Sequence, residues 1–129
     1  MTSILNKPLK ICSLNPITGY SRDGYCTYKN GDYGTHVVCA KLTKNFLRFT
    51  KKKGNNLVTP RNGFPGLKSG NKWCLCAKRW EEAREAGFAP PVDLNATDKS
   101  ALKFNNKNRY LNHKLTDKPK TRKLLRKRK

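Results

Sequence analysis

The sequence lacks several features that define whole classes of protein. No apolar run approaches the roughly 18 residues that a membrane-spanning helix needs. The first residues, MTSILNKPLK, have no apolar core of a secretory signal. Internal repeats, a dinucleotide-binding glycine motif and a P-loop motif are also missing. Since the chain has 129 residues, the length of one domain, we expect a single-domain, intracellular protein with no membrane-spanning segment.

Acidic residues are scarce, and their scarcity is uneven along the chain. The sequence holds 29 Lys and Arg against 8 Asp and Glu, for a net charge of +21. Residues 1–98 contain 16 basic and 7 acidic side chains, whereas residues 99–129 contain 13 basic side chains and one acidic. The excess of positive charge therefore gathers at the C-terminal end of the chain.

A run of like charges cannot form a packed core alone, and a polyanion such as a phosphate backbone would neutralise it. A solubilising tail or an import address is the competing interpretation. We predict polyanion-binding or partner-binding residues in this arm and at the end of the first helix. They are Lys118, Lys120, Arg122, Lys123, Arg126, Lys127, Arg128 and Lys129, together with Lys51, Lys52 and Lys53.

Turn residues divide the first third of the chain into segments too short for helices. The β-branched segment over 35–40 predicts a strand. A helix is expected next, capped by Thr43 and ended by Gly54, with Phe46 and Leu47 facing inward. An irregular connection over 54–72 follows, and its length favours a fixed, functional loop over a linker.

Two more helices are expected beyond this connection. Apolar residues recur at three- and four-residue steps from Lys72 to Ala86, and Thr97 can cap a third helix. The sequence thus predicts a small α+β domain with a short sheet, about three helices and long ordered loops. We expect it to span residues 1–104, followed by a basic arm over 105–129.

Five cysteines stand at positions 12, 26, 39, 74 and 76. An odd number without an export signal favours a reducing compartment and buried thiols over a disulfide framework. The spacings also allow a zinc site made of His36, Cys39, Cys74 and Cys76, because paired ligands two to four residues apart suit tetrahedral zinc. A helix over this region would point Cys74 and Cys76 in different directions, which weighs against that site.

A nucleophilic thiol is a further possibility. Cys39 or Cys76 could act as the nucleophile, with His36 as the base and Asp23 orienting the imidazole. The positive surroundings would favour a thiolate. Composition alone does not place these groups near one another.

An ordered series of motifs gives the chain a resemblance to a known family. The motifs are Thr18-Gly19-Tyr20 with Arg22-Asp23-Gly24, Asp32-x-Gly34-x-His36-x-Val38-Cys39-Ala40, Phe64-Pro65-Gly66-Leu67 and Trp73-Cys74-Leu75-Cys76-Ala77-x-Arg79-Trp80. Over residues 4–104 the chain resembles the family called domain of unknown function 2237. The resemblance implies a compact domain and makes Asp23, His36, Cys39, Cys74 and Cys76 part of the family pattern. Asp98 stands where we associate a histidine with the family.

These observations lead to one leading hypothesis and two alternatives. We expect a non-catalytic structural subunit of a large assembly, a viral capsid or a ribonucleoprotein particle, anchored by the basic arm and needing no cofactor. Its partners would be other protein subunits and RNA or DNA. The alternatives are an enzyme or zinc-binding module using the cysteines and histidine, and a free nucleic-acid-binding protein of low specificity.

Overall fold

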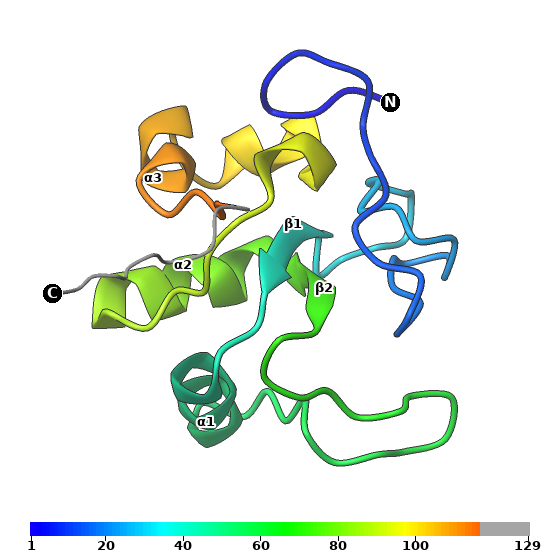
Figure 1. Ribbon diagram of the computed structural model, residues 1–129, viewed down its shortest axis with the longest axis vertical. Coiled ribbons are helices and arrows are strands. Elements are labelled where there is room, and N and C mark those ends of the chain that lie inside the picture. The colour runs from blue at the N-terminus through cyan, green and yellow to red at the C-terminus, as the bar shows by residue number, and fades with distance from the viewer. Residues whose placement is uncertain (117–129) are drawn as a thin grey trace, which may run out of the picture.

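The computed structural model describes residues 1–116 as a small α+β domain (Figure 1). Its elements are β1 (His36–Lys41), α1 (Lys44–Lys52), β2 (Lys72–Cys76), α2 (Ala77–Ala86), two 3₁₀ turns (Leu94–Ala96 and Lys99–Lys103) and α3 (Lys107–Leu111). Within these residues, no helix has the length and apolar character needed to cross a membrane. The predicted fold class is confirmed, and the predicted arm from residue 117 onward lies outside the described residues.

The two strands, which are separated in sequence by α1 and the long loop, pair as an antiparallel sheet. His36 is paired with Cys76 and Cys39 with Cys74, with an irregular register between His36 and Val38. Because side chains directly opposite in an antiparallel pair share a face, these two pairs project from the sheet together. The sheet therefore fixes the relative positions of four of the residues singled out from the sequence.

The segment from Lys72 to Ala86 corrects one prediction, because its first five residues form a strand and not a helix. Residues 72–76 alternate between the two faces of β2, and aromatic residues such as Trp73 suit strands. The three- and four-residue spacing that predicted a long helix holds only from Ala77, where α2 begins. Gly87 ends α2 in a left-handed conformation, as expected.

The other helices follow local sequence signals more closely. Thr43 caps α1 by accepting a hydrogen bond from the Phe46 N–H, as predicted. The helix expected after Thr97 is a 3₁₀ turn capped by Asp98. Thr97 instead accepts a hydrogen bond from the backbone N–H of Cys39 and donates one to the Asp93 carbonyl. Its hydroxyl therefore ties this segment to β1.

The core lies between the sheet and the helices and extends past residue 104, where we expected the domain to end. Tyr110 of α3 is fully buried and stacks on Trp80 of α2, with ring centroids 4.9 Å apart. The predicted long loop is anchored as expected: Leu67 is buried and Leu57 and Phe64 pack against the core. The helices and this loop therefore hold the sheet from one side.

The first 33 residues contain no helix or strand and lie on the other side of the sheet (Figure 1). Disulfides join this segment to the strands, Cys12 to Cys39 of β1 and Cys26 to Cys74 of β2. The expectation of five reduced thiols is thus wrong for four of them, because the fold brings these pairs to Cα separations of 5.7 and 5.3 Å. Cys76 alone stays unpaired among residues 1–116.

Candidate functional site

A cavity of about 510 Å³ opens where the N-terminal turns, the ends of both strands and the long loop meet. This volume suits a small-molecule ligand. Its walls are Thr18, Gly19, Tyr20, Arg22, His36, Asn55, Leu57, Phe64, Trp73, Cys74, Leu75 and Cys76. The cavity thus contains a free thiol, an imidazole and a guanidinium, the three chemically distinctive groups of this region.

The side chain of His36 is held by Asp32, which lies four residues earlier in the chain. Its Nδ1–H donates to Oδ1 of Asp32 at 2.6 Å, and its backbone N–H donates to Oδ2 of the same carboxylate at 2.8 Å. The Asp32 side chain has no exposed surface, whereas that of His36 is 43% exposed. Because a carboxylate accepts and does not donate, Nδ1 carries a proton, and in the neutral imidazole the lone pair is therefore on Nε2.

The imidazole ring is confined on another side by the backbone at Gly34. A Cβ atom at that position would lie 2.5 Å from Cε1 and 3.0 Å from Nε2 of His36. The neighbouring Thr35 has a left-handed backbone, with φ at 50°, which is uncommon for a β-branched residue. Strained backbone of this kind concentrates at functional sites. Here the backbone of Thr35 helps to set the direction in which the His36 side chain points.

Cys76 lies directly opposite His36 in the β1–β2 register, and both line the cavity. The thiol is half-buried and belongs to the residue that precedes the ten-residue helix α2 as its N-cap. The positive end of a helix dipole favours negative charge at such a position. The arrangement therefore places a thiol opposite an imidazole and at the start of a helix.

Arg22 and two aromatic rings form the rest of the reactive end of the cavity. The Arg22 guanidinium lies 5.1 Å from the ring centre of Trp73, and its Nη1 donates to the Gly19 carbonyl at 2.6 Å. Phe64 meets Trp73 edge-on at 5.6 Å. This wall combines one fixed positive charge with flat apolar surfaces.

The structure separates the residues of the predicted catalytic set. His36 and Cys76 are paired across the strands and both line the cavity, but Asp23 does not line it and instead accepts a hydrogen bond from the Tyr25 N–H at its own turn. Cys39 has no free thiol, because it forms a disulfide with Cys12. Asp32 takes the place that we expected Asp23 to fill. The four-residue spacing from Asp32 to His36 was the sequence signal that could have identified Asp32. An aspartate at this position is equally typical of a turn before a strand.

The predicted zinc set does not assemble either. Cys39 and Cys74 are bonded to different partners, so neither offers a thiolate to a metal shared with His36 and Cys76. Their placement on a strand, not a helix, does put Cys74 and Cys76 on one face of β2, contrary to the expectation from a helix.

The predicted polyanion-binding residues fall in two places. Lys51, Lys52 and Lys53 are exposed at the end of α1, far along the chain from the cavity residues of β2. The Lys53 ammonium lies 5.8 Å from the ring centre of Phe49. The eight predicted residues from Lys118 to Lys129 lie outside the described residues.

Comparison with known protein families gives a match over most of the chain. The model of a family described as an uncharacterized protein conserved in bacteria, DUF2237, matches residues 2–114. No curated protein matches the chain. The matched residues include both strands, all three helices and the whole cavity.

Proposed function

Since the chain belongs to the DUF2237 family, whose description states no activity, we propose from its cavity that it is a thiol-dependent enzyme with Cys76 as the nucleophile. His36 is the general base and Asp32 the residue that orients it. The observation that carries the proposal is the buried Asp32 carboxylate hydrogen-bonded to His36 directly across the sheet from a free thiol. A nucleophile, a base and a group that orients the base together make a recurring catalytic unit.

The chemistry follows from the roles of the three side chains. Nε2 of His36 takes the thiol proton as Sγ of Cys76 bonds to an electrophilic carbon or sulfur of the substrate. The imidazolium then returns that proton to the leaving group, so that charge and protons balance over the step. The negative charge of Asp32 stabilises the imidazolium in between, because the carboxylate is buried and already aligned with Nδ1.

The proposed substrate class rests on the walls of the cavity. A volume of about 510 Å³ admits a small molecule and excludes a folded protein partner. Arg22 is the one Lys or Arg among the lining residues, and Trp73 and Phe64 supply flat apolar surface. We propose a small anionic electrophile with an apolar or planar portion as the substrate.

Alkylation of the native chain by iodoacetamide tests the thiol site without a known substrate. We expect one fast-reacting residue, Cys76, located by mass spectrometry and lost in Cys76→Ser. His36→Gln should slow the reaction, because the group proposed to take the thiol proton is removed. His113→Gln is the matched control, since the sequence has only two histidines and His113 lies against Trp80, outside the cavity.

The same assay separates the two candidate orienting residues. Asp32→Asn should slow alkylation of Cys76, because the amide disturbs the tautomer and position of His36. Asp23→Asn should leave the rate unchanged. Equal rates in the His36 and His113 variants would overturn the proposed role of His36, and equal rates in the two aspartate variants would overturn that of Asp32.

A second candidate function rests on charge. The cations of α1 and of its C-cap are exposed, and within residues 1–116 none of them forms an ion pair: Lys44, Arg48, Lys51, Lys52 and Lys53. We propose as the alternative a structural subunit of a viral capsid or ribonucleoprotein particle, in which this face and the basic arm contact RNA, DNA or acidic subunits. Unpaired cations on one face are typical of a polyanion-binding surface.

Sedimentation of an extract from the native source tests this alternative. A structural subunit should migrate in a megadalton particle, and removal of residues 117–129 should abolish its incorporation. A free nucleic-acid binder should instead sediment alone and bind RNA and DNA with a steep salt dependence and little sequence preference. Migration as a free chain without such binding would leave only the enzyme proposal.

A further inference from the structure

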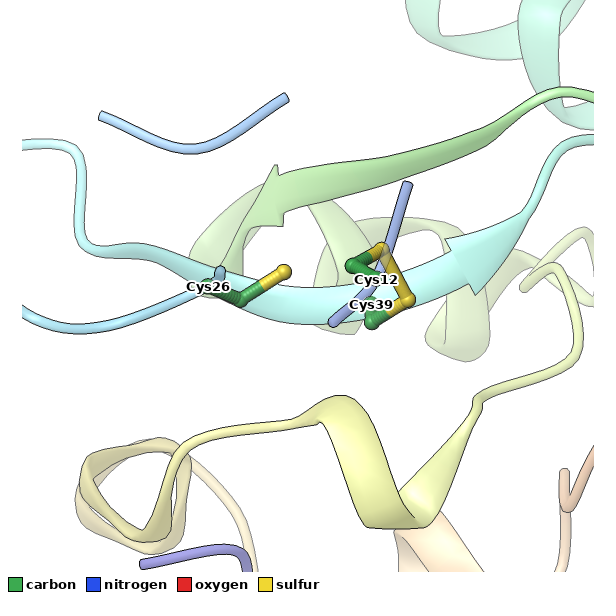
Figure 2. A group of neighbouring side chains, drawn as sticks. All are labelled: Cys12, Cys26 and Cys39. Carbon is green, nitrogen blue, oxygen red and sulfur yellow. A yellow bond between two sulfur atoms is a disulfide. The ribbon is translucent and has the colours of Figure 1, made fainter. Parts of the chain in front are cut away.

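Four buried sulfur atoms form one cluster beneath the sheet. The Sγ atoms of Cys12, Cys26 and Cys39 lie within 4.8 Å of one another, and Cys74 is bonded to Cys26. Figure 2 shows the Cys26 sulfur pointing at the Cys12–Cys39 disulfide from beside it. The two disulfides are therefore neighbours in one cluster and not separate cross-links.

The backbone, and not the sulfur bonds alone, brings these residues together. Cys39 and Cys74 are paired across β1 and β2. The N–H of Cys12 donates to the Gly24 carbonyl, two residues before Cys26, at 2.8 Å. All four cysteines are at most 4% exposed, with Ala96 closing the cluster. Reduction of the disulfides would thus leave four thiols held close together in a dry pocket.

We propose that the reduced cluster is a zinc site in which Cys12, Cys26, Cys39 and Cys74 bind one ion as four thiolates. Tetrahedral zinc has Zn–S bonds of about 2.3 Å, which places ligand sulfurs about 3.8 Å apart. Three of the sulfurs already lie within 4.8 Å of one another. Opening each S–S bond and seating the metal therefore needs side-chain adjustments and no new arrangement of the strands.

Electrons and protons balance in the conversion between the disulfide state and the zinc-bound state. Each disulfide takes two electrons and two protons from a dithiol reductant, giving four thiols, and zinc binding then releases four protons. In reverse, two molecules of a disulfide oxidant such as oxidised glutathione take four electrons from the four thiolates, forming two protein disulfides and releasing Zn²⁺. The cluster is thus a redox switch whose two states hold the same cysteines.

The fold gives a reason for the metal state. Residues 1–33 contain no helix or strand, and the two cross-links attach this segment to the sheet. In a reducing environment those links are lost, and an ion held by Cys12 and Cys26 of the segment and by Cys39 and Cys74 of the strands would replace both. The zinc site differs from the one expected from the sequence, since His36 and Cys76 remain in the cavity.

Zinc binding by the full-length reduced chain tests the proposal. The chain is reduced with a phosphine, desalted without oxygen, and titrated with Zn²⁺ against a chromophoric chelator. We expect one ion per chain in the wild type and in Cys76→Ser, the matched control that keeps the cluster. Binding should weaken at least 100-fold in Cys26→Ser, and the oxidised chain should bind none. Addition of oxidised glutathione should release the ion.

Cobalt provides a readout that does not depend on the folding of any variant. Co²⁺ added to the reduced wild type should give the intense visible bands of a tetrahedral tetrathiolate, displaced by one equivalent of Zn²⁺. A reduced wild type that binds neither metal would overturn the proposal. Binding by Cys26→Ser as tight as that by Cys76→Ser would overturn it as well, because the ion would then be held elsewhere.

Discussion

Nδ1 of His36 lies 2.6 Å from Oδ1 of Asp32, a carboxylate with no exposed side-chain surface. The same carboxylate accepts the backbone N–H of His36 through its other oxygen. The ring and its own main chain are therefore fixed by one buried group before any substrate arrives. Preorganised contacts of this kind need no rearrangement during a reaction. Mutations that displace the imidazole ring should therefore change the reaction rate.

Gly34→Ala should displace the imidazole and slow alkylation of Cys76 about as much as Asp32→Asn. The added Cβ would stand 2.5 Å from Cε1 of His36, so either the ring or the backbone must move. A double-mutant cycle measures which one moves. In the His36→Ala background the ring is absent, and Gly34→Ala should then change the rate little. An equal effect in both backgrounds would assign the loss to the backbone.

Arg22→Gly should lower the preference of Cys76 for a negatively charged reagent. Iodoacetate and iodoacetamide differ in charge, so the ratio of their rates isolates the electrostatic effect of the guanidinium. We expect this ratio to fall about two- to fivefold, the effect of one charge at several ångströms in a partly solvated site. Glycine suits the left-handed backbone at this position, where φ is 54°.

Arg61→Ala is the control for this prediction. Its guanidinium also lies over an aromatic ring, 4.9 Å from the centre of Phe64, but Arg61 does not line the cavity. Its variant should therefore keep the wild-type ratio. A ratio unchanged in both variants would contradict an anionic substrate held by Arg22.

The helices show how far local sequence signals reach. Thr43 before α1 and Gly87 after α2 mark helix ends through contacts within a few residues, and both were predictable. The strand over residues 72–76 was not, because Trp73 and Cys76 continue the three- and four-residue spacing of α2 toward its N-terminus. The pairing of β2 with β1, about 30 residues earlier, decided between strand and helix.

The candidate site could not be predicted for the same reason, because it depends on the pairing of β1 with β2. His36 and Cys76 could be named as reactive residue types, but only the strand register places them opposite each other. The disulfides were missed for a related reason: an odd cysteine count says nothing about which residues meet. Asp32 was a local signal, four residues before His36, yet Asp23 in its turn was an equally good candidate until the cavity was defined.

The cysteine pairing predicts a thiol count and a loss of stability. Under denaturing, non-reducing conditions the wild type should show one titratable thiol per chain and Cys76→Ser none. In the oxidised, metal-free chain, Cys12→Ser should lower the free energy of unfolding by about 3.5 kcal/mol and Cys26→Ser by about 4 kcal/mol. These values follow from closed loops of 27 and 48 residues. Five thiols in the oxidised wild type would contradict the pairing.

Glu81→Gln should weaken the attachment of α3 in a pH-dependent way. The bidentate hydrogen bond from Arg84 holds the pKa of Glu81 below its usual range, opposed by burial and assisted by Asn105 and Arg109. A carboxyl group whose pKa is lower in the folded state than in the unfolded state stabilises the protein at pH values above the unfolded-state pKa. This stabilisation is lost as the pH falls through the folded-state pKa. The variant should therefore melt earlier at neutral pH and converge with the wild type in acid.

Melting curves from about pH 7 down to about pH 3 provide the measurement for Glu81. Glu85→Gln is the matched control, since Glu85 belongs to the same helix and is exposed. It should follow the wild type across the range. A constant difference between Glu81→Gln and wild type at every pH would assign the effect to packing and not to charge.

Tyr110→Phe should have its largest effect near neutral pH and a smaller one in alkali. The buried hydroxyl donates to the Ala101 carbonyl at 2.8 Å, and burial, assisted by the charge of Glu81, raises the pKa of Tyr110. Loss of this hydrogen bond should cost about 1 kcal/mol. A raised folded-state pKa gives stability that is present below the unfolded pKa, near 10, and is lost as the pH rises above it.

The phenylalanine variant lacks that alkaline loss because it has no proton to release. The difference in unfolding free energy between wild type and Tyr110→Phe should therefore shrink from about pH 9 to about pH 11. Tyr33→Phe, whose residue is 98% exposed, should match the wild type throughout. A difference that stays constant into alkali would mean that Tyr110 ionises equally in both states, which its buried position against Trp80 argues against.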